Sequence, residues 1–212
     1  DEGLAHKYGM QIGRTFMEYA TKSDLNEIRA KTTAASDARM GGCPLPVMIN
    51  SGSGNQGITV SLPVYFFAEK NAIEQSVMLK ALLFSNLSNI YMKHFIGKLS
   101  AFCGGVSAAA AAGGGIGYLR GFSEDEIGMT ITNTLATSGG IICDGAKASC
   151  ASKISIALEN MFLALDLAKN EHAFQPGEGI VGRDIDETIR NIGKVARGMQ
   201  DTDDEVLDIM LS

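Results

Sequence analysis

Residues 99–119, LSAFCGGVSAAAAAGGGIGYL, carry no charged side chain over a length that could cross a bilayer. Ala, Gly and Ser make up most of this stretch, and they contribute little transfer free energy into lipid compared with Leu or Phe. Their small side chains instead allow helices to approach one another closely. The stretch therefore predicts a buried helix, or a helix and loop, that places the LSAFCGG segment at the centre of a soluble protein.

Helical patterns continue on both sides of this stretch. Apolar periodicity and capping residues predict helices at 3–21, 24–39, 58–70, 73–95, 123–137, 152–168 and 184–199, with a short acidic tail after the last. Ser123 with Glu126, and Asp24 with Glu27, have the spacing of capping boxes. The chain contains only 4 prolines and no strand alternation. It thus predicts an all-α fold, with one compact multi-helix domain over residues 1–212.

Composition limits the classes of function. Apolar residues make up 45% of the chain and the net charge is −6, so no basic surface is expected to neutralise the phosphates of a nucleic acid. No secretion signal opens the chain, and we expect a cytoplasmic protein without a membrane contact. Because the first residue is Asp1 and not Met, we also expect further residues upstream.

Residues 41–57, GGCPLPVMINSGSGNQG, break the helical pattern and predict a long, ordered Gly-rich loop. Its end, GSGNQG at Gly52–Gly57, matches the G-x-G-x-x-G pattern of dinucleotide-binding loops. That interpretation needs a strand before the loop, an uninterrupted helix after it and βαβ alternation elsewhere. Pro63 falls inside the expected helix and the alternation is missing, so the sequence disfavours a nucleotide site.

A second interpretation of the loop depends on its hydrogen-bond donors. Glycines let backbone N–H groups surround a small anion, and a carboxylate suits such a nest as well as a phosphate does. The alternative is a purely structural turn. If the loop binds the carboxylate of a small substrate, the residues that would contact it are Ser51, Ser53, Gly54, Asn55 and Gln56.

The four cysteines allow several interpretations. Cys43 lies at the start of the Gly-rich loop, and Cys103, Cys143 and Cys150 lie on glycine-containing segments further along. A disulfide network is not expected without a secretion signal, and the close C-x₂₋₄-C spacing of zinc sites is missing. An iron–sulfur cluster tolerates irregular spacing. The spacing alone leaves open both an iron–sulfur site and buried structural thiols.

Four separated motifs together carry a resemblance to a known family. LSAFCGG at 99–105, CDGAKASCASK at 143–153, SGSGNQG at 51–57 and DETIRNIG at 186–193 closely resemble the L-cysteine desulfidase family. That family is related to the α chain of bacterial iron–sulfur L-serine dehydratases. Its members are about twice as long as this chain. The resemblance therefore implies that the chain is the C-terminal, cluster-binding half, and that the missing N-terminal half is a partner.

The resemblance also implies a chemistry. Three family cysteines bind a [4Fe–4S] cluster, and they match Cys103, Cys143 and Cys150. The implied reaction is β-elimination of L-cysteine to sulfide, ammonia and pyruvate, or of L-serine to ammonia and pyruvate, with one open iron as a Lewis acid. Asp144 and Lys147 would tune the cluster as neighbouring charges, or are solvated loop charges. The family's N-terminal catalytic cysteine has no counterpart here, so the catalytic base is unknown.

An alternative from another class is a non-catalytic helical interaction domain whose cysteines are merely buried. Iron and acid-labile sulfide in anaerobically purified protein would distinguish the two functions. The sequence leaves open the choice between cysteine and serine, the role of Cys43, and whether the chain forms a homo-oligomer. It also makes a geometric prediction, because the three matched sulfurs should converge to within about 6–7 Å if they share one cluster.

Overall fold

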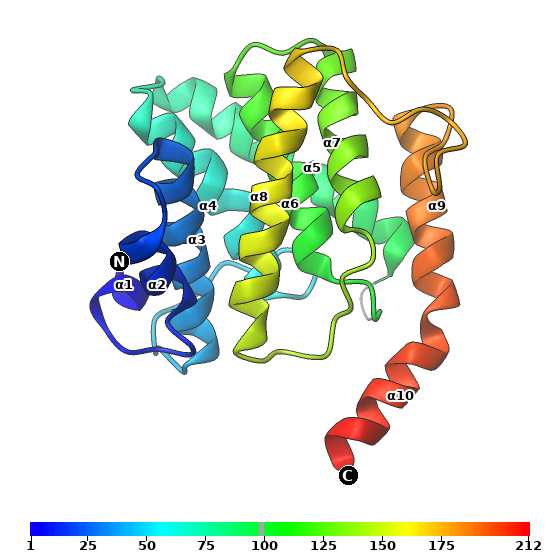
Figure 1. Ribbon diagram of the computed structural model, residues 1–212. Helices are drawn as coiled ribbons and strands as arrows, with labels where there is room; N and C mark the ends of the chain where they lie inside the picture. The colour runs from blue at the N-terminus through cyan, green and yellow to red at the C-terminus, as the bar shows by residue number, and fades with distance from the viewer. Residues whose placement is uncertain (98–99) are drawn as a thin grey trace.

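Figure 1 shows the computed structural model, which describes residues 1–97 and 100–212. These residues form ten helices: α1 (Glu2–Ala5), α2 (Ile12–Tyr19), α3 (Asp24–Met40), α4 (Gly54–Lys70), α5 (Gln75–Ile96), α6 (Gly104–Leu119), α7 (Glu124–Ser138), α8 (Ser149–Lys169), α9 (Ile185–Gly198) and α10 (Gln200–Leu211). Within the two described ranges no strand forms, and β-type pairing is confined to isolated bridges. The predicted all-α fold is confirmed.

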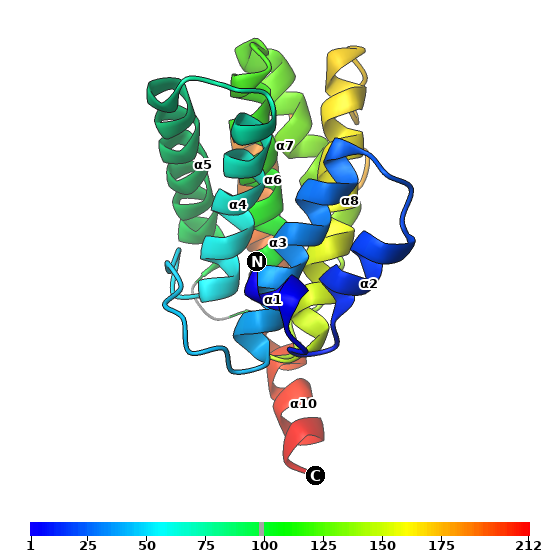
Figure 2. The same ribbon diagram turned by 90° about the vertical axis from the view of Figure 1, so that its left-hand side faces the viewer.

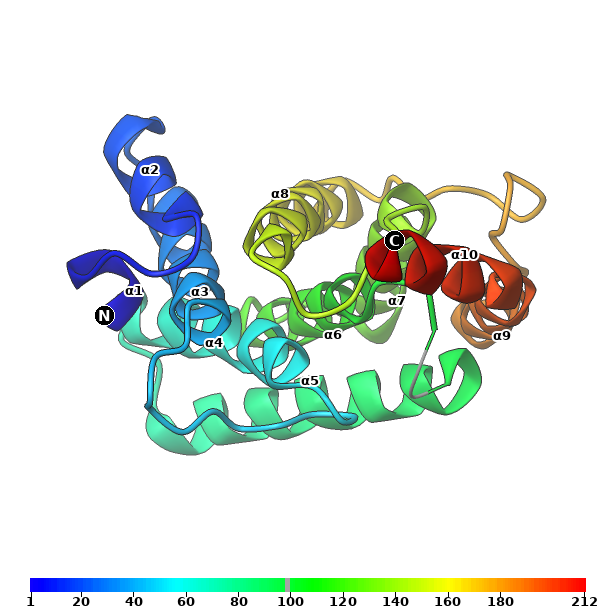
Figure 3. The same cartoon turned by 90° about the horizontal axis from the view of Figure 1, so that it is seen from below.

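Helix α6 runs through the middle of the molecule, with α5 on one side and α8 on the other (Figure 3). Its Ala108–Ala112 run is fully buried. A Cβ atom on Gly113 would lie 2.8 Å from Met161 Cγ, and one on Gly115 would lie 2.9 Å from Val64 Cγ2. Contacts this short leave no space for larger side chains, which explains why the sequence places Ala and Gly here.

The segment before α6 differs in part from the expectation. Leu99 lies outside the described residues, and Ser100–Cys103 precede the helix, which begins at Gly104. Ala101 and Phe102 are buried, so this part of LSAFCGG belongs to the core although it is not helical. Its backbone pairs with residues 141–143 instead, and this pairing competes with helix formation.

Residues 3–21 form two helices where the sequence pattern predicts one. Gly9 and Gln11 have φ angles of 53° and 54°, which a continuous right-handed helix cannot contain. The buried carboxylate of Asp37 on α3 accepts a hydrogen bond of 2.8 Å from the backbone N–H of Gly13. This distant acceptor fixes the start of α2 and separates it from α1.

The other helix boundaries lie within about one turn of the predicted ranges. The predicted capping box of Ser123 and Glu126 opens α7 with both reciprocal hydrogen bonds. The cap of α3 is Ser23 and not Asp24, because the Ser23 hydroxyl accepts from the N–H of Asn26. The predicted acidic tail is helical, and this helix, α10, projects away from the others (Figure 2).

Helix α5 presents an apolar stripe to solvent and a partly polar face to the core. The stripe is spaced at about one turn and is between 51% and 61% exposed; it consists of Leu79, Leu83, Leu87 and Ile90. The buried residues of the same helix are Ala81, Ser85, Asn89, Met92, Lys93 and Ile96. This arrangement reverses the usual pattern of a surface helix, in which the apolar side faces the core.

The structure also bears on two functions that the sequence disfavours. Helix α4 continues through Pro63, and no parallel sheet lies beneath GSGNQG among the residues that the structure describes. The dinucleotide interpretation is therefore excluded for this loop. Of the helices described, none combines the length and the apolar character that a bilayer-spanning segment requires.

Candidate functional site

The Gly-rich loop predicted for residues 41–57 is shorter in the structure: it ends in a tight turn over residues 50–53, and Gly54–Gly57 form the first turn of α4. Asn50 and Ser53 exchange backbone hydrogen bonds of 3.2 and 3.1 Å, and the central residues Ser51 and Gly52 have φ angles of 50° and 87°. Positive φ at both central positions is a feature of a type I′ turn and explains the glycine at 52. The Ser51 hydroxyl donates to Asn50 Oδ1 at 2.8 Å. The turn thereby fixes the start of α4, whose N-cap residue is Ser53.

A network of amide side chains binds this turn to α5. Asn50 Nδ2 donates to Asn86 Oδ1 at 2.9 Å. Asn89 Nδ2 donates to Asn50 Oδ1 at 2.8 Å and to Gln56 Oε1 at 3.2 Å. Asn89 Oδ1 is buried and has no hydrogen-bond partner among the described residues. A buried acceptor without a partner is costly, so this oxygen is a candidate contact for a ligand.

The first turn of α4 directs its side chains to two neighbours. Asn55 Oδ1 accepts from the Ser36 hydroxyl of α3 at 3.2 Å. Gln56 lies against the start of α6, because a Cβ atom on Gly104 would be 2.6 Å from Gln56 Nε2. No side chain in the described residues caps α4, so its first backbone N–H groups remain open to an anion. Of the predicted carboxylate-binding residues, Gln56 thus reaches the cysteine segment and Asn55 is held by α3.

Two of the three matched cysteines lie on paired segments. The Cys103 N–H donates to the Ile141 carbonyl at 3.2 Å, and the Cys143 N–H donates to the Ala101 carbonyl at 2.6 Å. Phe102 and Ile142, the residues that precede the two cysteines, form an antiparallel bridge. Because side chains alternate along such a pair, Cys103 and Cys143 lie on the same face of it. Segments 40 residues apart in the sequence are therefore held together at the start of α6.

The three matched thiols are electrostatic neighbours. Cys103 is 9% exposed, and burial raises the pKa of its thiol. The backbone N–H groups of Gly105 and Val106 oppose this shift, whereas charge on Cys143 and Cys150 adds to it. Cys103 needs a compensating positive charge to become a thiolate, because its surroundings favour the neutral form.

The Cys150 thiol forms its contacts within its own loop. It donates to the Gly145 carbonyl and accepts from the Lys147 N–H, both at 3.5 Å. Among the residues that the structure describes, no group of three or more His, Cys, Asp or Glu side chains is arranged to hold a metal ion. The donor type fits an iron–sulfur cluster, but Cys150 would have to leave these contacts to share one. The predicted convergence of the three sulfurs stays a prediction.

Lys93 is a buried cation that the sequence analysis missed. It lies one turn after Asn89 on the inner face of α5 and is 6% exposed. Burial lowers the pKa of its ammonium, and charge on Cys143 and Cys103 opposes that shift. Its ammonium forms no hydrogen bond or ion pair with any described residue. The i, i+4, i+8 spacing of Ser85, Asn89 and Lys93 places them on one face of the helix, but the sequence does not indicate that this face is buried.

The two charged residues of the CDGAKASC loop have different surroundings. Asp144 forms an ion pair with Lys153 of α8. The Lys147 side chain is exposed, and its described contact to Cys150 comes from the backbone N–H. Neither side chain forms a described hydrogen bond with a cysteine thiol. Their predicted influence on a cluster remains a hypothesis.

Cys43 has an environment of its own near the start of the chain. A side-chain hydrogen bond between Cys43 and Tyr8 raises the pKa of the Tyr8 hydroxyl. Cys43 lines a cavity of about 350 Å³ with residues of α1, α3 and α4, including Gly3, Arg39 and Ile58. The other three cysteines do not line this cavity.

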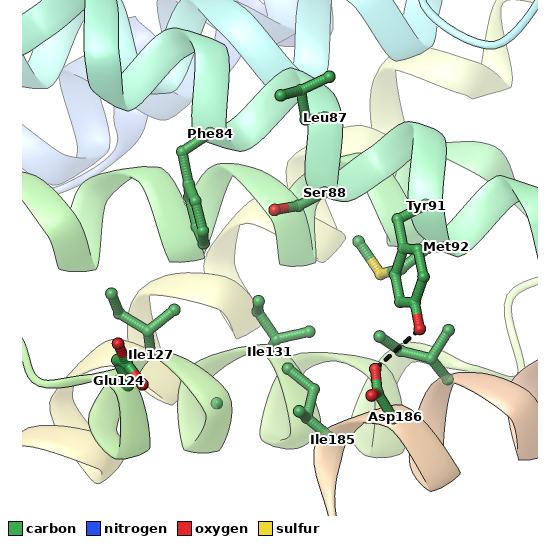
Figure 4. Close-up of a pocket in the computed structure, with 12 residues that line it drawn as sticks. Phe84, Leu87, Ser88, Tyr91, Met92, Glu124, Ile127, Ile131, Ile185 and Asp186 are labelled. Atoms are coloured by element: carbon green, nitrogen blue, oxygen red, sulfur yellow. Dashed lines mark hydrogen bonds between the residues drawn. The ribbon is translucent and has the colours of Figure 1, made fainter.

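An apolar groove of about 510 Å³ lies between α5, α7 and α9 (Figure 4). Phe84, Leu87 and Ile131 form much of its wall, and the Tyr91 hydroxyl donates to Asp186 Oδ1 at 2.9 Å at one end. No Cys, His or Lys lines it. Its ionisable side chains are Glu124, Asp186 and Tyr91, whereas the matched thiols lie elsewhere, near the N-terminal ends of α6 and α8.

Comparison with known proteins gives a family for this arrangement. The chain matches the family described as serine dehydratase alpha chain over residues 1–208. The chain belongs to this family. Its relatives include proteins described as UPF0597 proteins from Lachnoclostridium phytofermentans, Finegoldia magna and Treponema denticola, with 50%, 47% and 45% identity.

These relatives are longer than the chain. Each alignment covers 100% of the chain but only 51%, 51% and 50% of the respective relative. The chain thus spans about half the length of the curated relatives that it matches. No solved structure is similar enough to match.

Proposed function

We propose that the protein is an iron–sulfur-dependent amino-acid lyase that carries out β-elimination on L-cysteine or L-serine. The family match supports a lyase of the serine dehydratase type. The single observation that carries the proposal is the meeting of three elements at one place. Cys103 and Cys143 lie on paired segments, and Gln56 in the first turn of α4 contacts Gly104 beside them. Thiols next to a helix N-terminus without a side-chain cap suit a small anionic substrate.

We further propose that the chain is the C-terminal, cluster-binding half of a protein about twice as long. The length of the relatives supports this assignment. The other half would supply the group that removes the Cα proton, because the family's N-terminal catalytic cysteine has no counterpart in this chain. The substrate site would then be complete only when both halves are present.

Each residue of the candidate site has a role in this proposal. Cys103, Cys143 and Cys150 would hold a [4Fe–4S] cluster, which supplies an open iron as a Lewis acid when bound. Gln56 and the first N–H groups of α4 would orient the substrate carboxylate, together with Ser51, Ser53 and Gly54. Asp144 and Lys147 would act on the cluster as neighbouring charges.

The elimination itself requires a balanced movement of electrons. The Cα–H bond breaks, its electron pair forms the Cα–Cβ double bond, and the Cβ–S or Cβ–O pair leaves as sulfide or water after protonation. The aminoacrylate product tautomerises to an imine, and water hydrolyses it to pyruvate and ammonia. No external oxidant or reductant is needed. The protein has to position a base and stabilise the leaving group.

Anaerobic purification of the full-length protein tests this function. We expect bound iron and acid-labile sulfide in a ratio near one, and release of pyruvate from L-cysteine or L-serine. Removing the iron with a chelator should abolish this release. A colourless protein without iron that releases no pyruvate from either amino acid would instead support the alternative of a helical interaction domain.

A further inference from the structure

The inner face of α5 carries polar groups that the protein leaves incompletely partnered. Ser85 is satisfied, because its hydroxyl donates to the Val60 carbonyl at 2.7 Å. One turn further along, Asn89 Oδ1 is buried without a described partner. After another turn, the Lys93 side chain is 6% exposed and has no described partner. The polar side chains of α5 that lack a described partner are therefore the two that lie nearest the cysteines.

Lys93 is 6% exposed, and its Nζ is not among the fully enclosed polar atoms without a partner. An ammonium that has lost most of its water is expensive unless an anion compensates it. The acidic side chain of the neighbouring CDGAKASC loop, Asp144, already forms an ion pair with Lys153. No described carboxylate therefore pairs with Lys93, so in the iron-free protein an anionic ligand would supply the missing negative charge.

Two helix N-termini add to the positive potential of this region. Helix α4 begins at Gly54 without a side-chain cap among the described residues, and α6 begins at Gly104 with Cys103 as its N-cap. Both starts meet where Gln56 contacts Gly104. Backbone N–H groups at such ends attract anions. Gln56 also offers its Nε2 donor, while its Oε1 already accepts from Asn89.

We infer that Lys93, flanked by Asn89 and Gln56, binds the carboxylate of a small α-amino acid at this junction of α4, α5 and α6. The carboxylate would balance the ammonium, accept from Gln56 Nε2 and face the open N–H groups of α4. The substrate's amino group would then be available to Asn89 Oδ1. The identity of the ligand as an amino acid rests on the proposed function, whereas the anion site rests on the burial of Lys93.

Calorimetric binding to the iron-free, full-length protein tests this inference without turnover. The probes are L-serine, glycine, which has a carboxylate but no leaving group, and ethanolamine, which lacks the carboxylate. Lys93→Met should weaken the binding of L-serine and glycine by about tenfold or more, as expected for a lost charge-assisted contact. Binding of ethanolamine should not weaken. Lys80→Met, at an exposed lysine of the same helix, is the matched control and should leave the affinity for all three probes unchanged.

A second variant keeps the test decisive if Lys93→Met does not fold. Gln56→Glu keeps an oxygen that can accept from Asn89 but adds a negative charge. It should therefore weaken the binding of L-serine and strengthen the binding of ethanolamine. The inference would be overturned if folded Lys93→Met bound L-serine with wild-type affinity. It would also be overturned if this variant lost as much affinity for ethanolamine as for L-serine. A wild-type protein that binds neither L-serine nor glycine would overturn it as well. Lys93-dependent glycine binding without turnover of any amino acid would support the anion site and refute the proposed lyase function.

Discussion

At the scale of single residues, the four cysteines differ in what surrounds them. Cys103 and Cys143 lie on two segments that are paired by backbone hydrogen bonds, the Cys150 thiol bonds within its own loop, and Cys43 contacts Tyr8. Under the proposed function, Cys143→Ser should therefore remove most of the bound iron and the lyase activity, because a serine hydroxyl is a poor ligand for a cluster. Cys43→Ser should leave the iron content nearly unchanged. Iron analysis of both full-length variants checks this, and equal loss in both would contradict it.

The residues of the candidate site were only partly predictable from the sequence. The cysteine motifs and the Gly-rich loop can be recognised in the sequence itself. Their resemblance to the L-cysteine desulfidase family predicts an iron–sulfur cluster. Lys93 and Asn89 are not visible in this way, because the sequence of α5 predicts a helix without indicating which side faces the core. Their importance comes from burial and from the contact of Asn89 with Gln56, which only the fold establishes.

At the scale of elements, the packing of α6 makes opposite predictions for two glycines. A Cβ atom on Gly115 would lie 2.9 Å from Val64, 3.0 Å from Ser85 and 3.2 Å from the Ala81 carbonyl. Gly115→Ala should therefore destabilise the protein by about 1–3 kcal/mol through overpacking. Gly128 of α7 has no atom within 4 Å of such a Cβ, so Gly128→Ala should stabilise by about 0.5–1 kcal/mol through helix propensity. Chemical denaturation measures both, and shifts of the same sign would contradict the packing argument.

The elements were more predictable than the site. The capping box of Ser123 and Glu126 and the Ala/Gly run are local signals, and both correspond to what the structure contains. The break between α1 and α2 was not predictable, because it depends on the carboxylate of Asp37, 24 residues away from the N–H of Gly13. Local periodicity does not reveal a competing hydrogen bond from a distant element.

At the scale of the whole molecule, the outward face of α5 lacks a covering partner in the described residues. Isolated exposed leucines are normal on a protein surface, but an aligned stripe of Leu79, Leu83, Leu87 and Ile90 indicates an interface. Leu87 also lines the apolar groove of Figure 4, which extends this surface toward α9. The relatives carry about as many residues again as this chain. We therefore expect the other half of the full-length protein to cover the stripe.

A photo-crosslinker in place of Leu83 tests this expectation in the full-length protein. With p-benzoylphenylalanine at position 83, irradiation should join α5 to a peptide outside the 212 residues but within the same polypeptide. The same group at Gln175, in the exposed polar turn before α9, should give no such product. Crosslinks between two copies would identify a homo-oligomer as the occupant instead, and a lack of crosslinks would mean that the stripe stays exposed. A partner that covers the outer face of α5 would also restrict the motion of Lys93 on the inner face. The other half of the protein and the candidate substrate site would thus contact the same helix.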